Sequence, residues 1–264
     1  MTAVTDALAK ARADNRAALV GYLPVGYPSV DVSIDGMRAL VEGGCDVVEV
    51  GVPYSDPVMD GPTIQAAAEP AVRAGVGIAD ALRAVTAVRD AGGAAVIMTY
   101  WNPVERYGVE RFAADVAAAG GSGAITPDLI PDEAGEWLQA SDQHGLDRVF
   151  LVAPSSSDAR VAATAAASRG FVYAAALMGV TGARDAVGDA AATLVGRVRA
   201  LAPDVPVCVG LGVSNKAQAA QVAGFADGVI VGSALVRCLL GSPDADGVTA
   251  VRDLAADLAA GVRH

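Results

Sequence analysis

Apolar and polar positions along this chain change their period at regular intervals. Short runs of β-branched and small apolar residues are followed by longer alanine-rich segments with the spacing of amphipathic helices. Short apolar runs bounded by glycine and proline are typical of buried strands. We therefore predict strands at 18–23, 47–51, 95–99, 123–126, 149–152, 171–175, 205–210 and 228–231.

The alternation predicts an α/β protein with a parallel sheet, because parallel neighbours need the crossover that a helix supplies. With 264 residues, eight such units close most economically into one (β/α)8 TIM barrel, so we expect residues 1–264 to form a single domain. A doubly wound open sheet is the alternative, which the eight units disfavour. Two segments break strict alternation: an additional N-terminal helix at 5–15, which could plug the barrel bottom, and an extra helix after the second strand at 63–74.

The composition indicates a large core of small apolar residues, since 53% of the chain is hydrophobic and only 5% is aromatic. A net charge of −11 offers nothing to offset phosphate repulsion, so we expect no nucleic-acid partner. No apolar run reaches about 18 residues, and we expect neither a signal peptide nor a membrane span. Cys45, Cys208 and Cys238 lie far apart in apolar runs and indicate reduced core thiols of a cytoplasmic protein.

The stretch 47–65 places one carboxylate in a strand and a second on the loop that follows. Glu49 lies among three valines, where burial disfavours ionisation and should raise its pKa toward neutrality. Such a group can both give and take a proton. The alternatives are a strand-end glutamate paired with a surface arginine and, for Asp60, an ordinary Asp-Gly turn.

Other kinds of catalytic site find little support in the chain. Barrel enzymes place their sites at the carboxyl ends of the strands. Both lysines, Lys10 and Lys216, fall outside the predicted strands, which argues against a Schiff-base aldolase. The two histidines are His144, in a predicted helix, and His264, at the chain end, so we expect neither a histidine-ligated metal nor a histidine-activated nucleophile. By elimination, proton transfer falls to the two carboxylates.

Glycines follow the last predicted strands. Gly210 and Gly212 come after the seventh strand, and Gly232 with Ser233 after the eighth, where barrels often bind phosphate on backbone N–H groups and a helix N-terminus. A helix N-terminus needs no lysine, which fits an acidic chain. The segment 178–184 follows the sixth strand and has the make-up of a mobile lid. Ordinary strand-end turns and a plain surface loop are the alternatives.

In order and spacing, these segments resemble the tryptophan synthase alpha subunit over nearly the whole chain. The most specific match is V-E-V-G-V-P-Y-S-D-P-V-M-D-G-P-T-I-Q at 48–65. Further matches lie at 21–26, 98–103, 107–108, 127–129, 179–184, 210–212 and 232–233. The resemblance implies a barrel lyase of tryptophan biosynthesis that cleaves indole-3-glycerol phosphate, by retro-aldol acid/base catalysis, to indole and glyceraldehyde 3-phosphate.

The resemblance also implies roles for individual residues. Glu49 and Asp60 would be the catalytic pair, with Glu49 moving the protons and Asp60 accepting the indole N–H. The indole would be walled by three tyrosines, Tyr22, Tyr100 and Tyr173. The phosphate would be held by Gly182, Gly210, Gly212, Gly232 and Ser233. Thr181 would close the lid toward Asp60.

A partner is implied as well. The family passes indole to a beta subunit that carries pyridoxal phosphate, so this chain would hold no cofactor of its own and would join an alpha2beta2 complex. The surface facing the beta subunit would include Pro53, Asp56, Pro57, Asn102 and Asp128.

Four residues depart from what many relatives carry, namely Tyr27, Met59, Trp101 and Met178. They leave the chemistry intact and bear on loop packing and on communication between subunits. Three other interpretations stay open: a stand-alone lyase of the same substrate, a non-catalytic barrel that activates a beta subunit, and a phosphosugar isomerase on the same scaffold. The intact carboxylate pair argues against the second, and the apolar surroundings of Glu49 argue against the third.

Overall fold

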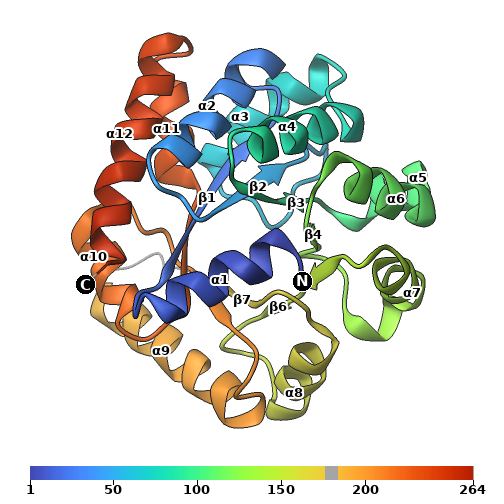
Figure 1. Cartoon of the computed structure of the whole chain (residues 1–264), viewed down its shortest axis with the longest axis vertical. Helices are drawn as coiled ribbons and strands as arrows, with labels where there is room; N and C mark the ends of the chain where they lie inside the picture. Colours follow the sequence, from blue (N-terminus) through green and yellow to red (C-terminus); the bar gives the residue numbers. More distant parts are fainter. Residues whose placement is uncertain (176–183, 264) are drawn as a thin grey trace.

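The computed structural model describes residues 1–175 and 184–263, whose strands form one parallel sheet (Figure 1). The strands are β1 (Ala18–Pro24), β2 (Val47–Gly51), β3 (Ala94–Met98), β4 (Gly123–Ile125), β5 (Asp147–Val149), β6 (Leu151–Val152), β7 (Val172–Ala175), β8 (Val207–Gly210) and β9 (Gly228–Val231). Their order is β5-β4-β3-β2-β1-β9-β8-β7-β6, and each paired neighbour is parallel.

The sheet closes through the two strands at the ends of this order. β5 pairs with β4 and β6 pairs with β7, and only Phe150 separates β5 from β6. The carbonyl of Phe150 accepts a hydrogen bond from the Tyr173 amide at 3.1 Å. β5 and β6 together therefore occupy the place of the predicted fifth strand, which begins at residue 147 rather than 149. The barrel prediction is confirmed, with nine strand segments in eight positions.

Helices surround the sheet (Figure 1). They are α1 (Ala3–Ala13), α2 (Val30–Glu42), α3 (Pro62–Arg73), α4 (Ile78–Asp90), α5 (Trp101–Tyr107), α6 (Val109–Ala119), α7 (Gly135–His144), α8 (Asp158–Ala167), α9 (Arg184–Leu201), α10 (Lys216–Ala223), α11 (Ser233–Gly241) and α12 (Ala245–Gly261), with the 3-10 turn η1 (Pro131–Glu133). None of the helices in the described part of the chain has the length and apolar character to cross a membrane.

The strands alternate between two apolar layers, as the period of two requires. In β1, Leu19 and Leu23 face the helices, whereas Ala18 and Val20 join a second cluster inside the barrel. Helix α1 closes the N-terminal end of this interior: its buried face, which includes Leu8, packs against that second cluster, and α1 crosses in front of the strands in Figure 1. Both extra helices predicted from the sequence, α1 and α3, are therefore present.

Some elements depart from strict alternation beyond these two helices. α5 precedes α6 after β3, η1 precedes α7, and α11 with α12 both follow β9. α5 was missed because Pro103 interrupts its short apolar pattern, although proline is tolerated in the first turn of a helix, where its missing N–H would be unpaired. The Trp101 amide at the start of α5 donates to the Asp128 carboxylate at 2.9 Å. That long-range cap leaves no local trace in the sequence.

Candidate active site

A cavity of about 390 Å³ opens at the carboxyl ends of the strands. Its lining residues continue the inward-facing alternation of the strands or lie in the loops that follow them. They are Tyr22, Glu49, Met59, Asp60, Gly61, Ile64, Met98, Tyr173, Gly210, Leu211, Gly212, Ile230, Gly232 and Ser233. Both predicted catalytic carboxylates and the described glycines predicted to bind phosphate therefore share one cavity.

Glu49 lies at the bottom of this cavity on β2, every residue of which is buried. Its residue exposure is only 1%, and its Oε1 atom has no hydrogen-bond partner in the described structure. Burial penalises the charged carboxylate and raises the pKa of Glu49 to about 8. At neutral pH the group therefore holds a proton that it can release, as the valine-flanked sequence predicts.

Asp60 reaches the cavity from the loop between β2 and α3. Its Oδ1 atom accepts a hydrogen bond from the Tyr100 hydroxyl at 3.2 Å, and its carbonyl oxygen accepts one from the Gln65 side chain at 2.8 Å. Burial raises the pKa of Asp60 to about 6, and the bond from Tyr100 opposes that rise. The two carboxyl groups thus have separated pKa values, so at neutral pH Glu49 is mainly protonated and Asp60 mainly ionised.

The three predicted tyrosines have two different placements. Tyr22 and Tyr173 line the cavity, whereas Tyr100 does not; it lies behind Asp60, where its ring stacks on Tyr54 with centroids 5.1 Å apart. The Tyr100 hydroxyl also accepts a hydrogen bond from the Met59 amide at 2.9 Å. Tyr100 therefore holds the Asp60 loop in this structure. The sequence carries no local signal for this contact, because it joins residues from two loops that are about 40 positions apart in the chain.

At the glycine-rich end of the cavity, the N-terminus of a helix faces the cavity and glycine backbone lies close to neighbouring side chains. α11 begins at Ser233 with Gly232 as its N-cap residue, so unpaired N–H groups and the positive end of the helix dipole face this region. Gly212 has a φ of +78°, a conformation that favours glycine. At Gly210 a Cβ atom would lie 2.4 Å from the Tyr173 hydroxyl, so this glycine makes room for the tyrosine ring.

Two predicted substrate contacts, Thr181 and Gly182, lie outside the described residues, as does Met178. Arg184, the last residue of the proposed lid, begins helix α9. Three residues that line the cavity, Met98, Ile230 and Ile64, were not among the site residues predicted from the sequence. For Met98 and Ile230 a signal was available, since both continue the inward alternation of their strands.

The residues predicted to face a partner lie in and beside the loop after β2. Pro53 is buried, Pro57 is half-buried and Asp56 is exposed. Asn102 is exposed and donates to the Tyr54 hydroxyl at 2.9 Å, while exposed Asp128 caps α5.

The same loop carries Val58, which is 83% exposed, and Met59, which is 51% exposed. Ile130, two residues after Asp128, is 40% exposed. Exposed apolar side chains next to polar ones are typical of a contact surface between proteins.

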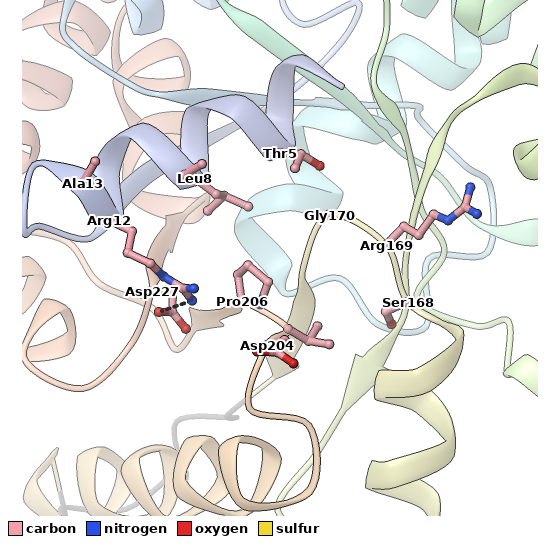
Figure 2. Close-up of a pocket in the computed structure, with 12 residues that line it drawn as sticks. Thr5, Leu8, Arg12, Ala13, Ser168, Arg169, Gly170, Asp204, Pro206 and Asp227 are labelled. Carbon is pink, nitrogen blue, oxygen red and sulfur yellow. Dashed lines mark hydrogen bonds and ion pairs between the residues drawn. The ribbon is translucent and has the colours of Figure 1, made fainter. Parts of the chain in front are cut away.

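A larger cavity, of about 550 Å³, lies at the opposite end of the barrel beside α1 (Figure 2). Its two arginines already have acidic partners: Arg12 pairs with Asp227 at 3.3 Å, and Arg169 pairs with Asp142 at 2.8 Å. Figure 2 shows the Arg169 side chain directed away from the other lining residues. Of its two lining carboxylates, Asp204 and Asp227, the second is held in the ion pair with Arg12, and we place the candidate active site at the carboxyl ends, where Glu49 and Asp60 share a cavity.

Metal binding finds no support in the described part of the chain, where no group of three or more His, Cys, Asp and Glu side chains is arranged to hold an ion. The cavity offers instead carboxyl groups, phenols and backbone N–H groups. This set can transfer protons at one end and bind an anion at the other.

Comparisons with known proteins show the family to which the chain is similar. The family model for the tryptophan synthase alpha chain matches residues 8–260. The tryptophan synthase alpha chain of Mycobacterium marinum is 66% identical over 253 residues, covering 96% of this chain and 92% of the relative. The structure of Mycobacterium tuberculosis tryptophan synthase in space group F222 contains a chain that is 62% identical, with a TM-score of 0.93 and coverage of 100% of this chain and 99% of that one. Tryptophan synthase subunit alpha from Legionella pneumophila is 32% identical, with a TM-score of 0.89 and coverage of 99% and 98%.

Proposed function

The chain belongs to the tryptophan synthase alpha chain family, and we propose that Glu49 and Asp60 are the residues that carry its reaction. The chain is a lyase subunit of tryptophan biosynthesis, which cleaves indole-3-glycerol phosphate to indole and glyceraldehyde 3-phosphate. One observation supports the assignment most strongly: two carboxyl groups with raised and separated pKa values line one cavity.

Glu49 would act first as an acid and then as a base. It protonates C3 of the indole ring, which makes the ring an electron acceptor. The resulting carboxylate then takes the proton of the hydroxyl group on the adjacent side-chain carbon. The bond between that carbon and C3 breaks, its electron pair returns to the ring, and the carbon becomes the aldehyde. Glu49 ends the cycle protonated, as its pKa of about 8 requires at neutral pH.

Asp60 would hold the indole nitrogen. Protonation at C3 spreads positive charge onto that nitrogen. An ionised carboxylate that accepts a hydrogen bond from the indole N–H group stabilises this charge. The pKa of about 6 keeps Asp60 mainly ionised at neutral pH. Tyr100 would aim the carboxylate through its hydrogen bond to Oδ1.

The phosphate would lie over Gly212, Gly232 and Ser233, at the start of α11. Backbone N–H groups and the helix dipole attract an anion there without a lysine. Gly210 would contribute indirectly, by leaving space for the Tyr173 ring. Thr181 and Gly182 would complete the site from the segment between β7 and α9.

Membership of this family makes the tryptophan synthase beta subunit the partner of this chain. We infer that the loop from Pro53 to Asp60, through its exposed residues such as Asp56 and Val58, meets that subunit together with Asn102 and Asp128 in an alpha2beta2 complex. Pyridoxal phosphate would then belong to the beta subunit alone. The free thiols of Cys45, Cys208 and Cys238 support a reducing, cytoplasmic location.

The proposal is tested by incubating the purified chain with indole-3-glycerol phosphate and measuring indole and glyceraldehyde 3-phosphate. Equal amounts of the two products are expected from the parent chain, and none above background from Glu49→Gln. Product formation that survives in Glu49→Gln would remove Glu49 from the mechanism. The same chain offered phosphosugars should give no isomerised product.

A further inference from the structure

Tyr22 runs along the cavity from its phosphate-binding end to its acid/base end. It lies on β1 in register with Glu49 on β2, and it lines the same cavity. A Cβ atom at Gly232 would lie 3.4 Å from Cδ1 near the base of the Tyr22 ring. At Gly51, a Cβ atom would lie 2.5 Å from the Tyr22 hydroxyl. The ring therefore starts beside the phosphate loops and ends, with its hydroxyl, above the strand that carries Glu49.

The Tyr22 hydroxyl makes no hydrogen bond to the described part of the chain. The Tyr100 hydroxyl, in contrast, is fully used, because it accepts from Met59 and donates to Asp60. Burial, Asp60 and Glu49 all raise the pKa of Tyr22, so the phenol keeps its proton and remains a donor. A buried phenol normally has a hydrogen-bond partner. The partner expected here is a group of the bound substrate.

The substrate has few groups that could fill this role. With its phosphate at Gly232 and its indole beside Asp60, the three-carbon chain spans the distance that the Tyr22 ring covers. Its hydroxyl groups are the only acceptors along that path. The hydroxyl on the carbon attached to the indole lies at the acid/base end, where the Tyr22 hydroxyl also lies.

Resting on the lyase site proposed above, we propose that the Tyr22 hydroxyl donates a hydrogen bond to this reacting hydroxyl oxygen of the substrate. As Glu49 takes the hydroxyl proton, negative charge grows on the oxygen until the aldehyde double bond forms. A fixed donor at that oxygen stabilises the charge during the step. Tyr22 keeps its own proton throughout, so no additional proton acceptor is needed.

Tyr22→Phe tests the role because it removes only the hydroxyl. We expect kcat for indole formation to fall about 10-fold and KM to rise about 3- to 10-fold, since the bond forms in the bound substrate and strengthens as the oxygen becomes charged. Tyr107→Phe is the matched control: its hydroxyl donates to Asp115 at 2.6 Å, away from the cavity, and its loss should leave kcat unchanged. An unchanged kcat in Tyr22→Phe would overturn the proposal.

A binding experiment separates the hydroxyl contact from packing of the ring. In a Glu49→Gln background the substrate stays intact. Its affinity can then be compared with that of an analogue whose three-carbon chain carries the phosphate but no hydroxyl groups. Adding Tyr22→Phe should weaken substrate binding about 3- to 10-fold and leave the analogue unaffected. Equal losses for both ligands would assign Tyr22 a packing role and overturn the proposal. Activity surviving in Glu49→Gln alone would instead refute the proposed site.

Discussion

The Tyr100 hydroxyl donates a hydrogen bond to Asp60 Oδ1 at 3.2 Å, and this contact ties the end of β3 to the loop after β2. The same hydroxyl accepts from the Met59 amide at 2.9 Å, so one phenol fixes both the backbone and the side chain of the loop. Residues 58 and 59 of that loop are exposed. Asp60 is therefore directed into the cavity by a residue that does not itself line it.

Replacing Tyr100 with Phe should show how far Asp60 depends on the hydrogen bond from the Tyr100 hydroxyl. The hydrogen bond from Tyr100 lowers the pKa of Asp60, so its loss should move that pKa upward from about 6. The acidic limb of kcat/KM should shift to higher pH, and activity at pH 7 should fall about 2- to 10-fold. A pH profile of indole formation by the isolated chain measures both effects. If activity falls while the acidic limb of the profile stays at the same pH, Tyr100 acts on something other than the ionisation of Asp60.

The parent chain should show a bell-shaped pH dependence of kcat/KM. Activity should rise through about pH 6 as Asp60 ionises, and fall above about pH 8 as Glu49 loses the proton it must donate. Asp60→Asn should abolish the acidic limb and lower turnover, while circular dichroism shows the fold intact because Asp60 is a loop residue. An Asp60→Asn chain that unfolds would indicate a structural role for this carboxylate.

The sequence predicted the barrel because strand periodicity is a local property. The valines around Glu49 were enough to predict a buried carboxyl group with a raised pKa, and that prediction is confirmed. The break of the fifth strand at Phe150 was not visible, since it follows from pairing with different neighbours on the two sides.

Loop contacts account for the remaining differences. Tyr100 was predicted to wall the indole; in the structure its hydroxyl binds Asp60 and its ring is not among the residues that line the cavity, so a contact with the indole stays a prediction. The capping of α5 by Asp128 likewise depends on two loops that meet only in the folded chain. The roles of Thr181 and Gly182 lie outside the described residues and stay predictions.

Glu49→Gln should stabilise the fold, increasingly at higher pH. In the unfolded chain Glu49 ionises near its ordinary pKa of 4.5, whereas in the folded chain it holds its proton to about pH 8. Between these values the folded state binds more protons, so stability falls as the pH rises through this window. The glutamine variant lacks this loss. Its Tm should exceed that of the parent by roughly 3–10 °C at pH 8 and by little at pH 4.5, in thermal unfolding followed by circular dichroism.

Gly232→Asp should weaken substrate binding through charge. A Cβ atom at this position makes only an ordinary contact, 3.4 Å from Tyr22, so the side chain itself should fit. The added carboxylate would repel the phosphate at the start of α11, and KM should rise about 10-fold or more. Gly77→Asp is the matched control, because it adds the same charge at the N-cap of α4, where a Cβ atom meets nothing within 4 Å. A normal KM for Gly232→Asp would place the phosphate elsewhere.

The beta subunit should raise the lyase activity of this chain, because the loop that carries Asp60 also carries exposed apolar residues. Contact with a partner over Val58 would order the loop and fix Asp60, so we expect low activity for the isolated chain and a marked rise on titration with a matching beta subunit. The coupling is reciprocal for binding, so a ligand in the alpha site should tighten the complex. Full activity of the isolated chain, with no change on titration, would support a stand-alone lyase.

Val58→Asp tests whether this surface is the one that transmits the effect. Val58 is 83% exposed and does not line the cavity, so the activity of the isolated chain should stay the same. The charge should oppose burial against the partner, so a higher concentration of beta subunit, about 10-fold or more, should be needed for the same stimulation. Leu201→Asp makes a similar change at another exposed apolar residue, 44% exposed at the end of α9, and should leave the titration unchanged. Because both variants add one negative charge, only a contact at Val58 predicts a difference between them.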